Sequence, residues 1–357
     1  FYRDWQRTLY EGNWAGIHWP EEYGGRGASL MEQVIYDQEM SRADVPEKLC
    51  TIGVWFVGPT LMELGTEAQR ERFIPRILTG EEVWCQGFSE PGAGSDLANL
   101  SLEAEEQGDD EFLLNGQKIW ISRVDATDYI VLMARTTPKS EVEKRTEGIS
   151  MFLVDLDAVR DQGTFDMKPI PKTASGAVHS YELWFEDMRV PAENLIGEEG
   201  QGFYQVLDGL NEERVVIAAE CIGLGEAAIM AGVDYANERE VFDRPIGKNQ
   251  AIQHPLAEAF AHVMAAKQVV YNATEVIHGA DRQMAGVHAN MAKYLAAESA
   301  FEAADIAVQA HGGFGVAREY DVERYLREAR LTRLVPIAQE LVLNYLGTKA
   351  LGLPRSY

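Results

Sequence analysis

The sequence predicts an α+β protein built from an N-terminal helical domain, a middle β-barrel or sandwich domain, and a C-terminal four-helix bundle. Three observations support this order. Residues 1–84 carry apolar residues at helical spacing, residues 85–196 hold short β-branched and aromatic runs, and residues 197–357 return to long helical periodicity. A chain of 357 residues is long enough for two or three packed units.

In the first two zones, the elements are short and are bounded by turn residues. Helices are expected at Met31–Arg42 and Glu67–Leu78, between the Gly- and Pro-rich segments Trp19–Gly27 and Gly58–Pro59. The predicted strands are Phe112–Leu114, Tyr129–Ala134, Ile149–Val154 and Tyr181–Phe185. Asn115-Gly116 predicts a hairpin turn between EFLL and QKIWIS.

In the third zone, long helices with short connections predict an antiparallel bundle. The expected helices are Gly202–Asn237, Asn249–Gly279, Ala285–His311, Val322–Arg333 and Pro336–Ala350. Pro336 suits the first turn of the last helix, where a backbone N–H is not needed.

The composition of the chain narrows its partners and its compartment. A balance of 57 acidic against 32 basic residues gives a net charge of −25, which repels nucleic acid and anionic membranes. The longest apolar run, Val215–Val233, contains Glu220 and Glu226, so we expect an interior helix and no membrane insertion. The N-terminus lacks the apolar core of a signal peptide. The chain has three dispersed cysteines without paired spacing, which favours a reducing cytoplasm, no disulfide framework and no metal site.

Ser89–Asp96, SEPGAGSD, is the segment of the sequence best suited to a ligand. Its glycines leave backbone N–H groups open to a bound group, and Ser89 and Ser95 add hydroxyls on either side. Taken alone, the same residues would also suit a plain turn between two elements.

The sequence motifs around this loop resemble those of a known protein family. QGFSEPGAGSDLA, followed by NGQKIWIS, resembles the signature of the acyl-CoA dehydrogenases. The likeness continues in WPEEYGGRGAS, GTEAQRERFIPRILTGE, FEDMRVPAENLIGEEGQGF, RPIGKNQAIQHPLAE and QAHGGFG, and so covers essentially the whole chain. WCQGFSEPGAGSDLA and the ending LGLPRSY look like a non-classical bacterial or archaeal branch. The chain begins later than most members do, and we expect their first helix to be missing.

The resemblance implies an FAD-dependent oxidoreductase that converts an acyl-CoA to a trans-2-enoyl-CoA and passes electrons to an electron-transfer flavoprotein. It also implies a homotetramer, built as a dimer of dimers. Phe88 and Ser89 would then meet the flavin ring, Trp120 would flank it, Ser122 would bond near flavin N5, and Ser95 would touch CoA.

Further FAD contacts are implied from a neighbouring subunit. They match Arg239, Phe242 and Gln250, together with the backbone-donor loop at Gln309, Gly312 and Gly313. The chain departs from many relatives at two nearby positions. Val241 replaces a hydroxyl residue and Asp243 replaces a glycine, so we expect one phosphate contact to be lost and an acid to lie close by.

The catalytic base is expected at an unusual position. Many relatives have a Glu before Gly-Thr late in the chain, where this sequence reads Leu334–Ala338 and has neither. A smaller set places the base before an Arg on the first helix of the bundle, which matches Glu213, with Arg214 and Asn211 serving CoA. The adjacent Glu212 should point elsewhere, about 100° round the helix. Pro336 lacks the N–H that relatives use at the late position to polarise the thioester.

Two other functions stay open on the sequence. An acyl-CoA oxidase on the same scaffold would return electrons to oxygen, and no motif separates it from a dehydrogenase. Alternatively, the chain is a non-catalytic or half-site subunit that completes its site with a homologous partner. Val241, Asp243 and the vacant late Glu position keep this second alternative open.

The charge composition leads to the first testable prediction. Of the 32 basic residues only 10 are Lys, and so large an acid excess with scarce Lys is typical of proteins from a high-salt cytoplasm, where screening limits self-repulsion. An ordinary acidic protein of moderate-salt origin is the alternative. We expect turnover and thermal stability to increase towards molar salt, and an activity optimum near zero added salt would exclude a halophilic source.

Overall fold

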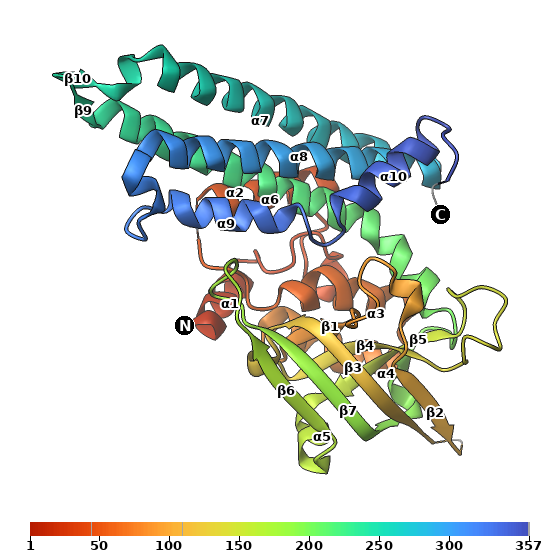
Figure 1. Ribbon diagram of the computed structural model, residues 1–357. Helices are drawn as coiled ribbons and strands as arrows, with labels where there is room; N and C mark the ends of the chain where they lie inside the picture. The colour runs from red at the N-terminus through yellow and green to blue at the C-terminus, as the bar shows by residue number, and fades with distance from the viewer. Residues whose placement is uncertain (44, 109, 356–357) are drawn as a thin grey trace. The chain divides into compact units, whose positions relative to one another are not determined.

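The computed structural model describes residues 1–43, 45–108 and 110–355, with the backbone alone at 208 and 209 (Figure 1). The chain divides into two compact units. The first comprises residues 1–28, 46–172 and 176–209, and the second comprises residues 29–45, 173–175 and 210–357. The first unit therefore joins most of the predicted N-terminal helical zone to the β zone, whereas the helix over residues 30–42 belongs with the C-terminal helices.

The helices of the first unit begin and end at clear local signals. They are α1 (Tyr2–Glu11), α3 (Gly58–Leu64), α4 (Glu67–Thr79) and α5 (Leu156–Gln162). Before α4, the Thr66 hydroxyl accepts from the Gln69 N–H while the Gln69 side chain accepts from the Thr66 N–H. This reciprocal pair is a capping box, and Gly80 ends the helix in a left-handed conformation. The predicted helix over Glu67–Leu78 is confirmed.

A mixed sheet forms the rest of the first unit. Its strands are β1 (Trp84–Gly87), β2 (Glu103–Gln107), β3 (Glu111–Ser122), β4 (Tyr129–Arg135), β5 (Ile149–Asp155), β6 (Phe165–Ile170), β7 (Ser180–Pro191) and β8 (Leu195–Ile196). They follow the order β6-β7-β3-β2-β4-β5-β8, and β1 pairs in parallel with β4. All four predicted strands are confirmed, and most are longer than the sequence pattern indicated.

The hydrophobic core of this unit consists of inward-facing strand residues. Phe112 and Leu114 on β3, Phe152 on β5 and Leu183 on β7 are almost completely buried together. Phe112 and Phe152 meet edge to face, with their ring centres 5.0 Å apart. This arrangement of aromatic rings fills the sheet interior and fixes the position of β3, the strand that carries KIWIS.

The hairpin predicted at Asn115-Gly116 is wrong. β3 runs without a break from Glu111 to Ser122, and the Asn-Gly pair lies at a bulge in its pairing with β7. Gly116 has φ +147°, and a Cβ there would lie 2.9 Å from the Leu102 Cα. The Asn115 side chain bonds across to Asp187, accepting from its N–H at 2.8 Å. The pair that often makes a turn instead bends a strand, because β7 continues alongside it.

The second unit is a helical bundle. Its long helices, α6 (Gly202–Glu238, from residue 210 onwards), α7 (Gln250–Ile277), α8 (Arg282–His311) and α9 (Val322–Thr332), run side by side in Figure 1. The unit also contains α2 (Leu30–Arg42), α10 (Gln339–Lys349) and the two-residue strands β9 (Glu240–Val241) and β10 (Arg244–Pro245). α8 begins three residues before the predicted start, because the Asp281 side chain caps the N–H groups of Gln283 and Met284.

Helix α6 carries the apolar run that was predicted to lie in the interior. Among the described residues it is the one helix long and apolar enough to cross a membrane by length and composition, and 61% of its most apolar window is buried within the protein. Its Glu226 carboxylate lies 2.9 Å from the Lys267 ammonium of α7 and accepts from Gln38 of α2. At Gly223 a Cβ would lie 2.2 Å from the Gln38 carbonyl oxygen, so α2 packs directly on the α6 backbone. These contacts are those of a core helix.

The last helix starts later than the sequence indicated. Pro336 lies in the bend between α9 and α10, and α10 begins at Gln339, so the prediction of a helix from Pro336 is wrong. The Lys293 ammonium of α8 donates to the Ile337 carbonyl at 2.9 Å. This contact ties the connection to the bundle, where an α-helical turn would have used that carbonyl internally.

The bulge in β3 gives a stability prediction. Gly116→Ala places a Cβ against the Leu102 backbone at a φ that L-residues rarely adopt, so we expect a loss of about 1–3 kcal/mol in the free energy of unfolding. Gly176→Ala is the matched control, since a Cβ there meets nothing within 4 Å. Denaturant unfolding measures both variants. Equal stabilities would show that the bulge does not require glycine.

Candidate functional site

The first unit contains a pocket at the end of β1. It has a volume of about 90 Å³, enough for part of a planar ring and not for a whole dinucleotide. Its walls come from the residues after β1, from the end of β3 and from the segment before α3: Ile52, Gln86, Phe88, Ser89, Trp120, Ile121 and Ser122. The structure thus brings together Phe88, Ser89, Trp120 and Ser122, the four residues predicted to meet a flavin ring.

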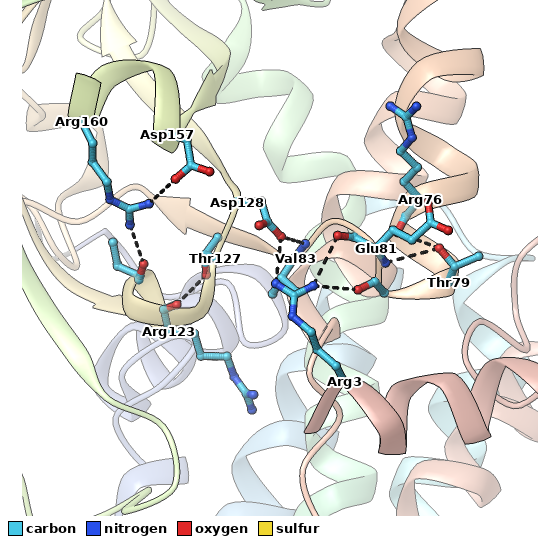
Figure 2. A network of polar contacts seen from close by, with 12 residues as sticks. Arg3, Arg76, Thr79, Glu81, Val83, Arg123, Thr127, Asp128, Asp157 and Arg160 are labelled. Atoms are coloured by element: carbon cyan, nitrogen blue, oxygen red, sulfur yellow. Dashed lines mark hydrogen bonds and ion pairs between the residues drawn. The ribbon is translucent and has the colours of Figure 1, made fainter. Parts of the chain in front are cut away.

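A polar network connects the start of β1 to the segment between β3 and β4 (Figure 2). The Val83 N–H, just before β1, donates to the Asp128 carboxylate at 2.7 Å, and Arg3 lies 3.5 Å from the same oxygen. Between β3 and β4, the Thr127 hydroxyl donates to the Arg123 carbonyl at 2.5 Å. The start of β1 and the connection that follows Ser122 are therefore bonded to the same short segment.

Trp120 is placed by a second bulge in β3. The pairing with β7 shifts between Lys118 and Ile121, and Trp120 adopts φ +64°. Its side chain is 58% exposed, whereas Ile121 beside it is buried. An aromatic residue of a sheet core would be covered, whereas the face of this indole is accessible at the pocket. Because a bulky residue rarely has positive φ, the bulge makes Trp120 a candidate functional residue.

Behind the pocket lies a buried ion pair that the sequence patterns did not reveal. The Lys118 ammonium lies 2.9 Å from the Glu90 carboxylate and donates to the Phe88 carbonyl at 3.1 Å. Glu90 also accepts from the backbone N–H groups of Ser101 and Leu102. A lysine within an apolar strand run and an acid within a Gly/Pro loop were the available signals, but neither names the other as partner.

The charges of this pair follow from its surroundings. Burial lowers the pKa of Lys118 to about 8, and Glu90 opposes that shift. Burial raises the pKa of Glu90, but Lys118 and the Leu102 and Ser101 donors outweigh it, so the net pKa of Glu90 is lowered. Both groups are ionised at neutral pH, and the pair is a true buried salt bridge.

The remainder of the SEPGAGSD loop is held from both sides. Glu90 and Ala93 exchange backbone hydrogen bonds of 3.0 Å, which close the turn around Pro91 and Gly92. Further along, Ser95 is exposed. The next segment is fixed by the buried Arg135 guanidinium, which donates to the backbone carbonyls of Ala98, Leu100, Arg145 and Glu147. Ser89 therefore lies at the pocket while Ser95 faces outward, so the two hydroxyls occupy different surroundings.

In the second unit, α6 presents the predicted base and its neighbours. The Arg214 guanidinium donates to the Asn211 side chain at 2.9 Å, so these two predicted CoA-binding residues are brought together. Burial raises the pKa of Glu213, and the Arg214 charge only partly opposes it. Glu212 is exposed and points away, with its carboxylate 3.8 Å from the His278 ring. Glu213 is thus the carboxyl on this turn that is suited to take up a proton.

The six residues predicted to reach a neighbouring subunit's cofactor are exposed at the surface of the second unit: Arg239, Phe242, Gln250, Gln309, Gly312 and Gly313. Phe242, at the tip of the β9–β10 hairpin, is 91% exposed. The Arg239 guanidinium carbon lies 6.0 Å from the Phe314 ring centre, which places the hairpin beside the segment after α8. Asp243 has φ +59° and so keeps the backbone conformation that glycine would adopt there.

The three cysteine thiols are not accessible at the surface. Cys50, Cys85 and Cys221 are buried and unpaired, and burial raises the pKa of each thiol to about 12. Across residues 1–43, 45–108 and 110–355, no three His, Cys, Asp or Glu side chains form a cluster that could hold a metal ion.

Comparison with known protein families covers nearly the whole chain. The acyl-CoA dehydrogenase N-terminal domain matches residues 1–81, the middle domain matches residues 85–188, and the C-terminal domain matches residues 200–336. The chain belongs to the acyl-CoA dehydrogenase family. It is therefore an oxidoreductase of the class that acts on acyl-CoA thioesters, as the resemblance of its motifs implied.

Individual members of the acyl-CoA dehydrogenase family are similar to this chain over most of their length. The acyl-CoA dehydrogenase FadE12 of Mycobacterium tuberculosis is 35% identical over 342 residues, which cover 96% of this chain and 86% of FadE12. The butyryl-CoA dehydrogenase of Megasphaera elsdenii superimposes with a TM-score of 0.86 at 29% identity, over 98% of this chain and 89% of that one. The ChsE4–ChsE5 complex of M. tuberculosis gives 0.88 at 29% identity, over 99% and 90%. The helical, β and helical organisation is the fold of this family.

The raised pKa of Glu213 predicts how stability depends on pH. An acid whose pKa is raised by burial destabilises the folded state at pH values where the acid ionises, and this penalty disappears below the ordinary glutamate pKa of about 4.3. Glu213→Gln should therefore raise the melting temperature at pH 8, and its advantage should shrink as the pH falls. The exposed Glu212→Gln is the control and should show no such trend. A lower melting temperature for Glu213→Gln at pH 8 would contradict the burial argument.

Proposed function

We propose that the chain is an FAD-dependent acyl-CoA dehydrogenase that forms a trans-2-enoyl-CoA, with Glu213 as the base that removes the α-proton. The observation that carries the proposal is the place of Glu213 on α6 beside the Arg214–Asn211 pair, in a chain whose late segment Leu334–Ala338 has no glutamate; burial there raises the pKa of Glu213. An acid whose pKa is raised towards neutrality matches a proton-abstracting role better than an ordinary surface carboxylate does.

The residues of the first-unit pocket fit a flavin ring. An exposed indole, two hydroxyls and the backbone of the Phe88–Ser89 segment line it, and ring recognition needs an aromatic face together with a few polar groups. Trp120 would cover one face, while Ser89 and Ser122 would donate to the polar edge. The FAD, when bound, supplies the acceptor for the hydride that leaves the β-carbon.

Glu213, Arg214 and Ile337 of the second unit would each interact with a different part of the substrate. Glu213 would take the proton from the carbon next to the thioester carbonyl, and its raised pKa limits the cost of holding that proton. Arg214, held by Asn211, would bind the phosphate-rich CoA portion of the substrate. Polarisation of the thioester at the late segment cannot use an N–H of Pro336, so the neighbouring Ile337 N–H is the candidate donor.

We further infer a cytoplasmic homo-oligomer, built as a dimer of dimers, that delivers electrons to an electron-transfer flavoprotein. The exposed Arg239, Phe242 and Gln309 support an oligomer, because phosphate- and ring-binding residues at the surface need a partner molecule to act on. Arg239 would pair its guanidinium with the cofactor pyrophosphate of a neighbouring subunit.

One alternative is favoured by a specific observation. Val241 and Asp243 lie on the hairpin beside Arg239, where relatives have a hydroxyl residue and a glycine, and an acid there opposes pyrophosphate binding. Among the similar structures, ChsE4–ChsE5 is a complex of two named components. A half-site subunit that needs a homologous partner is therefore the second candidate function.

The visible spectrum of the chain purified alone distinguishes these functions. A yellow protein that acyl-CoA bleaches without air supports a self-sufficient dehydrogenase, and a colourless protein that does not take up FAD supports the half-site alternative. Rapid recovery of colour on admitting air would instead indicate an oxidase.

Glu213→Gln tests the base. The variant should keep bound flavin but lose bleaching by acyl-CoA by about 10³-fold or more, because the amide cannot accept the proton. In the wild type, kcat/KM should rise with pH as the Glu213 carboxyl, whose pKa is raised, loses its proton. Glu212→Gln, one residue away and exposed, should bleach normally. Turnover that persists in Glu213→Gln would show that another group is the base.

A further inference from the structure

We propose that Lys118 is a positioning residue for the cofactor pocket: its ammonium fixes the Phe88 carbonyl and thereby aims the Phe88–Ser89 segment at the flavin ring. This inference rests on the proposed function. It adds a role for a residue that lies behind the pocket wall and does not line it.

The contacts of Lys118 converge on the backbone that forms the pocket. Its ammonium donates to the Phe88 carbonyl at 3.1 Å, and the next residue on its strand, Ile119, donates its N–H to the Ser89 carbonyl at 2.9 Å. Two consecutive carbonyls of the loop are thus bonded to two consecutive residues of β3. With both carbonyls bound to the strand, the Ser89 side chain is left on the pocket side, where it lines the wall.

The same strand then turns Trp120 into the pocket. The bulge that gives Trp120 its positive φ begins directly after Lys118 in the pairing with β7. Phe88 is also held on its far side, where its ring meets Phe56 edge to face at 5.4 Å between ring centres. Lys118 therefore links the two walls, the Phe88–Ser89 segment and the Trp120 bulge, through one fully buried charge.

Stability alone does not account for a charged residue here. The cross-strand partner of Lys118 on β7 is the buried Leu183, and neighbouring inward positions of β3 are apolar. Replacing a buried ion pair by apolar residues is often neutral or stabilising, whereas the pair fixes hydrogen-bond geometry that apolar residues cannot. A long aliphatic stem with an ammonium end reaches both Glu90 and a backbone carbonyl, and this double contact is the property that the pocket uses.

The test compares three variants of the full chain. Lys118→Met keeps the volume but removes the donor to Phe88. Lys118→Met/Glu90→Gln also removes the unpaired buried carboxylate, and so provides a folded variant if the single change unfolds the protein. Leu183→Ala is the matched control, because it opens a cavity at the cross-strand partner and leaves the Phe88 contact intact. For each variant, FAD affinity is measured by titration of the apoprotein, together with the visible absorption spectrum and reduction potential of the bound flavin.

We expect both Lys118 variants to bind FAD about tenfold more weakly and to shift the flavin spectrum and potential, since one charge-assisted hydrogen bond that orders the wall is lost. The double variant should recover thermal stability relative to Lys118→Met without recovering FAD affinity. Leu183→Ala should melt earlier, yet keep the wild-type affinity, spectrum and potential.

Two results would overturn the inference without touching the proposed function. One is a folded Lys118→Met chain with wild-type affinity and spectrum, and the other is restoration of both in the double variant, which would reduce the role of Lys118 to charge balance. A wild-type chain that binds no FAD would overturn the proposed function, and the positioning role with it.

Discussion

A buried salt bridge supports the pocket at the end of β1. The Lys118 ammonium and the Glu90 carboxylate, 2.9 Å apart, join β3 to the loop that follows β1. Glu90 continues the connection to Ser101 and Leu102. Arg135 donates to the carbonyls of Ala98 and Leu100 in the next segment, and also to those of Arg145 and Glu147. A loop rich in glycine has little preference for one conformation, because glycine loses much backbone freedom on ordering. Two buried cations supply the order that the loop residues cannot, so the glycines can leave backbone groups open to a ligand.

Sequence periodicity locates most of the bundle helices closely, although not the start of α10, and it does not locate the strand bulges. A buried helix repeats its apolar positions along one segment, so α7 and α9 could be located to within one or two residues. Asn115-Gly116 has the composition of a hairpin turn, but whether the chain reverses there depends on what lies alongside. The continuous β7 and the Asn115–Asp187 contact decide in favour of a bulge. These partners are about seventy residues away, beyond any local pattern.

The same limit applies to the site. Phe88, Ser89, Trp120 and Ser122 line one pocket. The family resemblance allowed this to be anticipated, because the motif after β1 and the motif at the end of β3 occur together in the family. The exposure of Trp120 could not be anticipated, since Ile119, Trp120 and Ile121 form a continuous apolar run typical of an ordinary strand, and only the bulge leaves the indole exposed. Lys118 and Glu90 were missed because 28 residues separate them and each has a common surface role. Only the fold shows that both are buried and therefore must be partners.

The proposed position of the base, Glu213 on α6, is consistent with the chemistry of the late segment. In that segment Pro336 lacks an N–H and Lys293 donates to the Ile337 carbonyl, so a negative base there would lie near a buried ammonium that holds its proton affinity down. On α6 the balance differs. The Arg214 guanidinium is directed to Asn211, and burial prevails in raising the pKa of Glu213. A carboxyl on a long helix keeps its geometry through helix packing rather than loop contacts. If Glu213 is the base as proposed, the connection before α10 needs no carboxylate, and its proline is compatible with catalysis.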